Sequence, residues 1–324
     1  MKKVAVVFNG GTISMVVDEK IHAAVPGLSG EQIMNMVSGI ERFAEVESYT
    51  FSNVPSPHMT IEDMLKLSKY IKNILDKPDI AGVVVTHGTD TLEETAYLVD
   101  LTIDSYKPII FTGAMRSSSE LGYDGPFNLA SSISAILSEE SQNRGVLVCF
   151  NGELNSASEV TKMSTMDLNA FRTPTFGPIG IVDNNRTIYY RNNLKSEKLI
   201  VDSINAKVDL IKCVAGEDSG LINFCLDKGD NGIIIEALGR GNVPPKMIPG
   251  IQRAIDNKVP IVIVSRCFEG RVFESYGYLG GGKYLKDMGV ILADNLPGQK
   301  ARIKLLLALS KKQDIDFVRK QFEY

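Results

Sequence analysis

The chain has three histidines, four cysteines and no tryptophan among its 324 residues, and the first two scarcities limit its chemistry. The histidines lie far apart and no two cysteines have the spacing of a zinc-ligand motif, so we expect no metal site. The cysteines stand in or beside apolar runs, which predicts reduced core residues in a cytosolic protein. They are Cys149, Cys213, Cys225 and Cys267.

Long hydrophobic runs and a basic surplus are also missing. No apolar stretch approaches the roughly 20 residues of a membrane-spanning helix, so we expect no membrane partner. The formal net charge is −4 and lysine and arginine are spread along the chain, which argues against nucleic-acid binding. The apolar run after Lys3 is short and ends in Asn9-Gly10-Gly11, as a first strand would, whereas a secretion signal needs a longer run. These features predict a cytoplasmic protein.

What the chain does have is an alternation of short apolar runs with segments of helical periodicity. Its 44% hydrophobic residues are enough for full cores, and its length suits two domains. Valine-rich runs such as 82–85 predict strands buried on both faces of a parallel sheet. The expected strands lie near 3–8, 46–51, 81–86, 108–112, 145–150, 208–213, 231–236, 260–265 and 289–292. The expected helices lie near 29–39, 60–76, 91–103, 125–139, 219–228, 245–257, 298–310 and 314–322.

The alternation is interrupted once, in the middle of the chain. From Asn151 to about Tyr190 the sequence is polar with short strands, and a charged stretch then opens a linker. We therefore predict an α/β fold with a larger domain over 1–190, a linker over 191–206 and a smaller α/β domain over 207–324.

Polar side chains follow the run Val83-Val84-Val85 just before a helix begins. They supply hydroxyls, an imidazole and a carboxylate where ligands bind in open α/β sheets. Asp90 could simply cap the helix, but capping needs a single polar residue. His87 could serve as a general base or could be a satisfied structural residue, and the sequence leaves both open. The polar residues are Thr86, His87, Thr89, Asp90 and Thr91.

A second polar turn follows the first expected strand. Gly10 and Gly11 allow a sharp turn and a close ligand approach, and they leave the hydroxyl of Thr12 available. The turn lacks the pattern of a dinucleotide-binding loop and of a P-loop, so on its own it indicates no more than a tight turn. Lys162, taken alone, is typical of an ordinary surface lysine.

Taken together, these motifs resemble those of the asparaginase/glutaminase family. The stretch Asn9 to Ser14 is similar to the family's first signature, and Gly82 to Leu92 matches its long second signature throughout. Further family landmarks follow in family order across nearly the whole chain. They are Gly113-Ala114-Met115-Arg116, Asp124-Gly125-Pro126-Phe127-Asn128, Lys162, Gly239-Arg240-Gly241-Asn242 and Pro297-Gly298-Gln299-Lys300-Ala301-Arg302.

The resemblance implies a flavodoxin-like larger domain and an amidohydrolase that needs no cofactor. It implies that Thr12 is the nucleophile, that Thr89, Asp90 and Lys162 form a second catalytic group, and that the substrate is L-asparagine. It also implies a homo-oligomer, a dimer or a dimer of dimers, in which a neighbouring subunit completes each site. The substrate-binding residues that it implies are Gly11, Ser56, Gly88, Thr89, Asp90 and, from the neighbouring subunit, Asn242.

The chain departs from the family pattern in the first loop and after Ser56. Asn9 stands where the first signature usually has threonine, and Pro57-His58 replaces a polar pair of the secreted relatives. The loop 15–27 carries no tyrosine, although many relatives place one there beside the nucleophile. We hypothesise that Tyr278, or else Tyr276, supplies the missing phenol, while the alternative is that both pack the smaller domain.

The resemblance thus predicts a cytoplasmic asparaginase. The alternatives are a broader asparaginase/glutaminase and a catalytically silent amino-acid sensor on the same fold. The sensor is disfavoured because binding an amino acid does not require the hydroxyls of Thr12 and Thr89 together with Lys162.

Overall fold

The computed structural model describes residues 3–193 and 197–322. The chain forms two compact units, Met1–Lys198 and Leu199–Tyr324, which we describe separately. The predicted boundaries at 190 and 206 stay a prediction, and residues 194–196 of the expected linker lie outside the described residues. Within the first unit, Arg191 forms an ion pair with Glu159, so this part of the expected linker packs on the domain before it.

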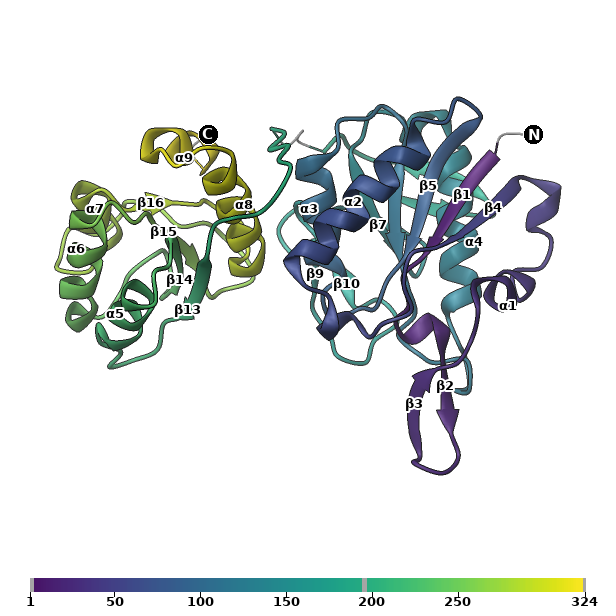
Figure 1. Ribbon diagram of the computed structural model, residues 1–324, viewed down its shortest axis with the longest axis horizontal. Helices are drawn as coiled ribbons and strands as arrows, with labels where there is room; N and C mark the ends of the chain where they lie inside the picture. Colours follow the sequence, from purple (N-terminus) through teal and green to yellow (C-terminus); the bar gives the residue numbers. More distant parts are fainter. Residues whose placement is uncertain (1–2, 194–196, 323–324) are drawn as a thin grey trace. The chain divides into compact units, whose positions relative to one another are not determined.

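The first unit is built on an eight-stranded sheet (Figure 1). Its five parallel strands lie in the order β4-β1-β5-β6-β7, which is the 2-1-3-4-5 order of a flavodoxin-like sheet. Three further strands extend one edge in antiparallel pairings. The strands are β1 (Lys3–Phe8), β4 (Glu45–Thr50), β5 (Ile80–Thr86), β6 (Ile109–Thr112), β7 (Val146–Phe150), β8 (Glu153–Ser156), β11 (Gly180–Asp183) and β12 (Arg186–Tyr189).

Helices cover both faces of this sheet, as the buried strands predict. Alternate residues of β5 point to opposite faces: Val83 and Val85 pack with α2 and α3, whereas Val84 packs with α1 and α4. The flavodoxin-like expectation is therefore confirmed. The helices are α1 (Gly30–Asn35), α2 (Ile61–Leu75), α3 (Leu92–Thr102) and α4 (Gly125–Leu137). Short 3₁₀ turns lie at Thr12–Ser14, Ile40–Arg42, Ser56–His58 and Glu139–Ser141, and β9 (Thr161–Lys162) pairs with β10 (Phe171–Arg172).

The helix α1 is shorter than the segment 29–39 predicted from its periodicity. Ser29 and Gln32 form a capping box that fixes its start. The helix ends at Asn35, and the chain then turns through Gly39, whose left-handed conformation (φ 83°) precedes a 3₁₀ turn. Periodicity alone does not mark this end because the apolar pattern continues past it.

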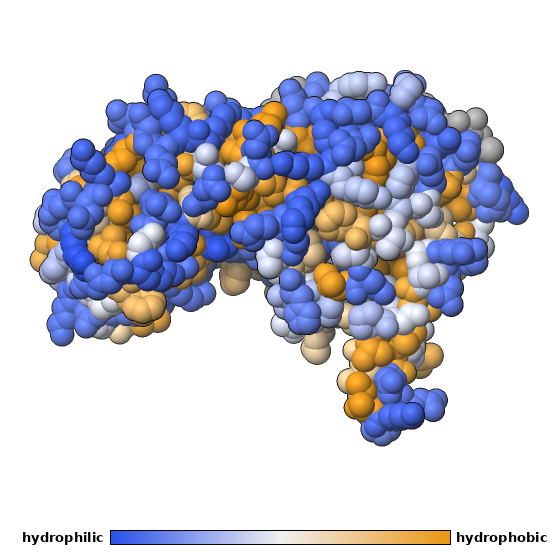
Figure 2. Space-filling view, viewed as in Figure 1, coloured by the Kyte–Doolittle hydropathy of each residue, from blue (hydrophilic) through white to orange (hydrophobic). Residues whose placement is uncertain are grey.

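The segment after Thr12 is a β-hairpin, where the sequence suggested a loop. Strands β2 (Met15–Asp18) and β3 (Ala23–Pro26) pair antiparallel, and Asp18 Oδ1 accepts hydrogen bonds from the Lys20 and Ile21 amides at the turn. The hairpin projects from the unit and shows apolar side chains along its length (Figure 2). Val17 and Ile21 are among its exposed apolar residues.

The second unit is a smaller parallel α/β domain, as predicted. Its sheet has the order β13-β14-β15-β16, with Ile233 and Ile235 packed against α5 and α6 and the opposite face covered by α8. The strands are β13 (Val208–Lys212), β14 (Gly232–Ala237), β15 (Ile261–Ser265) and β16 (Ile291–Leu292). The helices are α5 (Gly220–Asp227), α6 (Ile248–Asp256), α7 (Gly282–Met288), α8 (Gly298–Lys311) and α9 (Ile315–Phe322), and a 3₁₀ turn at Pro245–Met247 precedes α6.

The cysteine prediction is correct for three residues and wrong for one. Cys149, Cys213 and Cys225 are buried and free, whereas Cys267 is exposed. Cys267 lies two residues after the end of β15. The apolar run ends with the strand, so the side chain of Cys267 is not buried along with it. Over the described part of the chain, no helix combines the length and apolar character needed to cross a bilayer.

Candidate active site

The two predicted polar loops lie side by side at the carboxyl edge of the first sheet. Strands β1 and β5 are hydrogen-bonded neighbours, and Phe8 pairs with Thr86 at their ends. The next strand of this sheet along the chain, β4, lies on one side of β1, and the strand after it, β5, lies on the other side. This is the topological switch point, where loops diverge and leave a crevice for a ligand.

Glycines allow the loops after β1 and β5 to touch. Gly11 has φ 88°, and a Cβ placed there would come within 2.3 Å of the Gly88 backbone. A Cβ on Gly88 would in turn come within 2.7 Å of the Ser56 side chain. The packing therefore brings Gly11, Gly88 and Ser56 together, and half-buried Thr12 follows Gly11 at the start of a 3₁₀ turn.

Thr89, Asp90 and Lys162 form one hydrogen-bonded group. The Lys162 ammonium donates to Thr89 Oγ1 at 2.9 Å and to Asp90 Oδ1 at 2.8 Å. Thr89 is buried, whereas 61% of the Asp90 side chain is exposed. A cation thus polarises a buried hydroxyl beside a carboxylate that a ligand can reach.

Ser56 joins this group through the helix start of α3. Its hydroxyl accepts a hydrogen bond from the Asp90 amide at 3.2 Å, and its carbonyl accepts one from Thr91 Oγ1 at 2.9 Å. The N-cap of α3 is Thr91, and no side-chain cap bond is formed. Asp90 therefore does not cap the helix, which was the alternative interpretation of this residue.

Glu93 is a buried carboxylate at the site that the sequence motifs did not point to. Its Oε1 accepts hydrogen bonds from Thr161 Oγ1 and from the Lys162 amide, each at 3.1 Å. It thereby ties the backbone of Lys162 to α3, the helix that begins just after Asp90. Glu93 is the second residue of α3, and the local sequence gives no sign of its role because its partners lie 68 and 69 residues away.

His87 is a structural residue in this site. It is fully buried, Nδ1 bonds the Gly88 carbonyl at 2.8 Å and Nε2 bonds Thr95 Oγ1 at 2.9 Å. Burial lowers the pKa of His87 to about 4, and the bond to Gly88 opposes that shift. The neutral imidazole has both nitrogens engaged, so it offers no free acceptor for the general-base role.

Asn242, Tyr276 and Tyr278 belong to the second unit. Asn242 Oδ1 accepts a hydrogen bond from the Gly282 amide at 3.2 Å, which fixes its side chain. Tyr276 and Tyr278 contact each other with ring centres 5.5 Å apart, and 43% and 56% of their surfaces are exposed. They do not pack into the core of the smaller domain, and their suggested role beside Thr12 stays a prediction.

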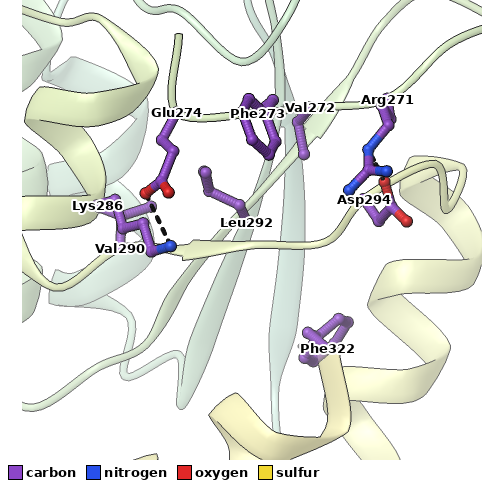
Figure 3. A pocket seen from close by; sticks show the side chains of 9 residues that line it. All are labelled: Arg271, Val272, Phe273, Glu274, Lys286, Val290, Leu292, Asp294 and Phe322. Atoms are coloured by element: carbon purple, nitrogen blue, oxygen red, sulfur yellow. Dashed lines mark ion pairs between the residues drawn. The ribbon is translucent and has the colours of Figure 1, made fainter. Parts of the chain in front are cut away.

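The second unit also holds a pocket of about 240 Å³ (Figure 3). Its charged lining side chains form two ion pairs, Arg271 with Asp294 at 2.8 Å and Lys286 with Glu274 at 2.7 Å. Val272, Leu292 and Phe322 are among its apolar lining residues. These charges are matched within the protein, so the pocket does not favour a charged ligand of either sign.

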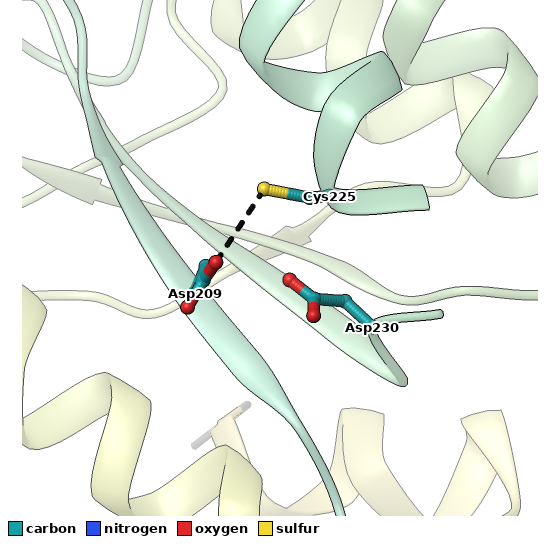
Figure 4. A group of neighbouring side chains, drawn as sticks. All are labelled: Asp209, Cys225 and Asp230. Atoms are coloured by element: carbon teal, nitrogen blue, oxygen red, sulfur yellow. Dashed lines mark hydrogen bonds between the residues drawn. The ribbon is translucent and has the colours of Figure 1, made fainter. Parts of the chain in front are cut away.

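Three neighbouring side chains in the second unit, Asp209, Cys225 and Asp230, could together bind a metal ion (Figure 4). Their ligand atoms lie within 4.8 Å of one another, an arrangement that sequence spacing did not reveal. Lys228 forms ion pairs with both carboxylates, which balances the charge that would attract a cation. Burial, and then the charge of Asp209, raises the pKa of Asp230.

Comparison with known proteins agrees with this geometry. Residues 3–195 match the family model described as "Asparaginase, N-terminal", and residues 207–322 match "Glutaminase/Asparaginase C-terminal domain". The chain therefore belongs to the asparaginase/glutaminase family.

Individual relatives cover nearly the whole chain. An L-asparaginase of Bacillus licheniformis is 35% identical, over 95% of this chain and 96% of its own length. A subunit of the glutamyl-tRNA(Gln) amidotransferase of Pyrococcus horikoshii is 32% identical, over 98% of this chain and 74% of its own length. The crystal structure of a probable cytoplasmic L-asparaginase from Campylobacter jejuni superposes with a TM-score of 0.89, at 30% identity and over 100% of both chains.

Proposed function

We propose that this protein hydrolyses the side-chain amide of L-asparagine to L-aspartate and ammonia, with Thr12 as the nucleophile. The observation that carries the proposal is the hydrogen bond from the Lys162 ammonium to Thr89 Oγ1. Thr89 follows Gly88, which packs against Gly11, and Thr12 is the residue after Gly11.

The chemistry would proceed through an acyl-enzyme. Thr12 Oγ attacks the amide carbon, its proton is relayed through the Thr89 hydroxyl to the leaving nitrogen, and the Thr89 amide stabilises the oxyanion. The C–N bond breaks and the protonated nitrogen leaves as ammonia. Water then attacks the ester, restoring Thr12 and releasing aspartate. These steps transfer protons and no redox electrons, so the proposal includes no cofactor.

Substrate groups would be held by residues around this centre. The exposed Asp90 carboxylate suits the α-ammonium of an amino acid, and Ser56 lies next to it to bind the α-carboxylate. Gly11 and Gly88 would contribute backbone groups to the substrate site, because their contact holds the two loops together beside Ser56. We infer from family membership that Asn242 comes from a neighbouring subunit, so the working form is a homo-oligomer, a dimer or a dimer of dimers.

We further propose a cytoplasmic location. The likeness to a probable cytoplasmic enzyme over the whole chain supports it, as do the buried free cysteines. A relative of this family from Haemophilus influenzae is named as a probable periplasmic L-asparaginase, so family membership alone does not decide the compartment.

The test is ammonia release from L-asparagine and L-glutamine, measured in parallel with Thr12→Ala. We expect turnover of asparagine by the parent protein and a loss of several orders of magnitude in the variant, typical of nucleophile removal. Equal turnover of both amides would favour the broader asparaginase/glutaminase, consistent with the name of the C-terminal family model. Binding of asparagine without ammonia release would identify a sensor and refute the proposal.

A further inference from the structure

We propose that Tyr123 is a positioning residue for Thr12. Its hydroxyl donates a 2.6 Å hydrogen bond to the carbonyl of Ile13, across 110 residues of sequence. Ile13 is fully buried and follows Thr12 within the same 3₁₀ turn. The phenol therefore fixes the backbone next to the proposed nucleophile and acts on Thr12 through Ile13.

The segment 117–123 holds the chain after Thr12 at further points. Ser118 donates from both its hydroxyl and its amide to the Met15 carbonyl, at 2.9 and 3.2 Å. Ser119 Oγ accepts a hydrogen bond from the Val17 amide at 2.9 Å. The start of the β2–β3 hairpin is thus attached to this segment, and Tyr123 is the attachment nearest to Thr12.

The segment is itself anchored firmly enough to act as a support. The buried carboxylate of Asp124 accepts hydrogen bonds from the amides of Met115 and Arg116 and from Asn128 Nδ2. Asn128 Oδ1 in turn accepts from the Asn151 amide, which follows β7. These bonds fix the residue next to Tyr123 to the ends of two strands of the central sheet.

The loop that carries Thr12 needs such a support. Gly10 and Gly11 precede the nucleophile and both have positive φ, so the local sequence leaves the backbone many conformations. A nucleophile contributes fully only when its attack geometry is fixed before the reaction. Burial raises the pKa of Tyr123, so the phenol stays protonated and can donate its hydrogen bond at physiological pH.

Gly125 provides the space in which the Tyr123 ring lies. A Cβ on Gly125 would come within 2.5 Å of the ring, and its three nearest atoms all belong to Tyr123. Gly125 does not have positive φ, so a substitution there meets the ring rather than backbone strain. This gives a second way to move the phenol without changing Tyr123.

The first experiment compares Tyr123→Phe with Tyr189→Phe. Tyr189 is a matched control: it packs against the same hydrophobic cluster and its hydroxyl bonds Ser141 Oγ at 2.7 Å. A reacting group misplaced by about 1 Å can lower the reaction rate about 100-fold. We therefore expect Tyr123→Phe to lower kcat for asparagine about ten-fold. We expect KM to stay near the parent value and Tm to fall alike in both variants. Parent-like kcat in Tyr123→Phe, or equal kcat losses in both variants, would overturn the inference.

The second experiment tests whether Gly125 acts through the ring. We expect Gly125→Ala to lower kcat in the parent protein and to cause no further loss in a Tyr123→Ala background. An equal loss in both backgrounds would show that Gly125 acts independently of the phenol and would count against the inference.

This inference rests on the proposed function, and Thr12→Ala separates the two. If Thr12→Ala retained activity, the proposed nucleophile would be wrong and Tyr123 would have no nucleophile to position. If Thr12→Ala were inactive while Tyr123→Phe behaved like the parent, only the role of Tyr123 would fail.

Discussion

Replacing Lys162 with methionine tests the centre of the proposed mechanism. The substitution keeps a long unbranched side chain but removes the ammonium, and with it the bonds to Thr89 Oγ1 and Asp90 Oδ1. Thr89 then loses its charged donor, and Asp90 loses its counter-ion within the protein. The hydrogen bonds that Glu93 accepts from the Lys162 amide and from Thr161 Oγ1 can remain.

The two consequences differ in size. In the ion pair between Lys162 and Asp90, the Asp90 side chain is 61% exposed. Loss of this pair should therefore lower the free energy of unfolding by at most about 1 kcal/mol. A group that assists proton transfer contributes about 10²–10⁴-fold in rate. That range corresponds to about 3–5 kcal/mol in the activation free energy. We therefore expect a near-parental Tm together with a large loss of kcat.

Steady-state ammonia release separates the roles of Lys162. KM should stay near the parent value, because Asp90 and Ser56 still bind the substrate and Asp90 no longer pairs with a lysine. Lys162→Arg is the matched control: it keeps the charge but replaces a compact ammonium with a planar fork, so it should also lose most of kcat. A large rise in KM with unchanged kcat in Lys162→Met would make Lys162 a binding residue and refute the reasoning.

The remaining predictions concern neighbouring residues. Asp90→Asn should raise KM for asparagine much more than for succinamic acid, which lacks the ammonium; equal losses on both substrates would assign Asp90 another task. Glu93→Ala should lower kcat because Lys162 loses its backbone anchor, whereas Glu93→Gln retains an acceptor oxygen and should stay close to the parent; identical kcat in both variants would contradict this. His87 has a folded pKa of about 4, below its usual 6.5, so its contribution to stability is complete above pH 6.5 and is lost as pH falls toward 4. The Tm of the parent should therefore fall more steeply than that of His87→Gln over this range, and parallel curves would exclude the effect. Mixing inactive Thr12→Ala and Asn242→Ala proteins should restore activity after subunit exchange, since one site of each hybrid dimer carries neither change; demonstrated exchange without recovery would count against the shared site.

The sequence by itself determined the kind of fold and the position of the site along the chain. Valine-rich runs such as Val83-Val84-Val85 have no polar position, so they fit a strand covered on both faces. Gly11 and Thr12 after the first strand, and Thr89 and Asp90 after β5, had to share one sheet edge because parallel strands end on the same side. Local patterns suffice for such features because they depend on neighbours within a few residues.

Tertiary structure alone decided which distant side chains support that site. Nothing in the pattern around Glu93 distinguishes a solvent-facing helical glutamate from the buried acceptor of Thr161 and Lys162. Tyr123 likewise shows no local sign of its bond to Ile13, and the exposure of Cys267 depends on where the chain runs after β15. These contacts join segments far apart in sequence, and they arise because folding fixes whole elements against each other. The free energy that selects them comes from packing, which single-sequence periodicity does not contain.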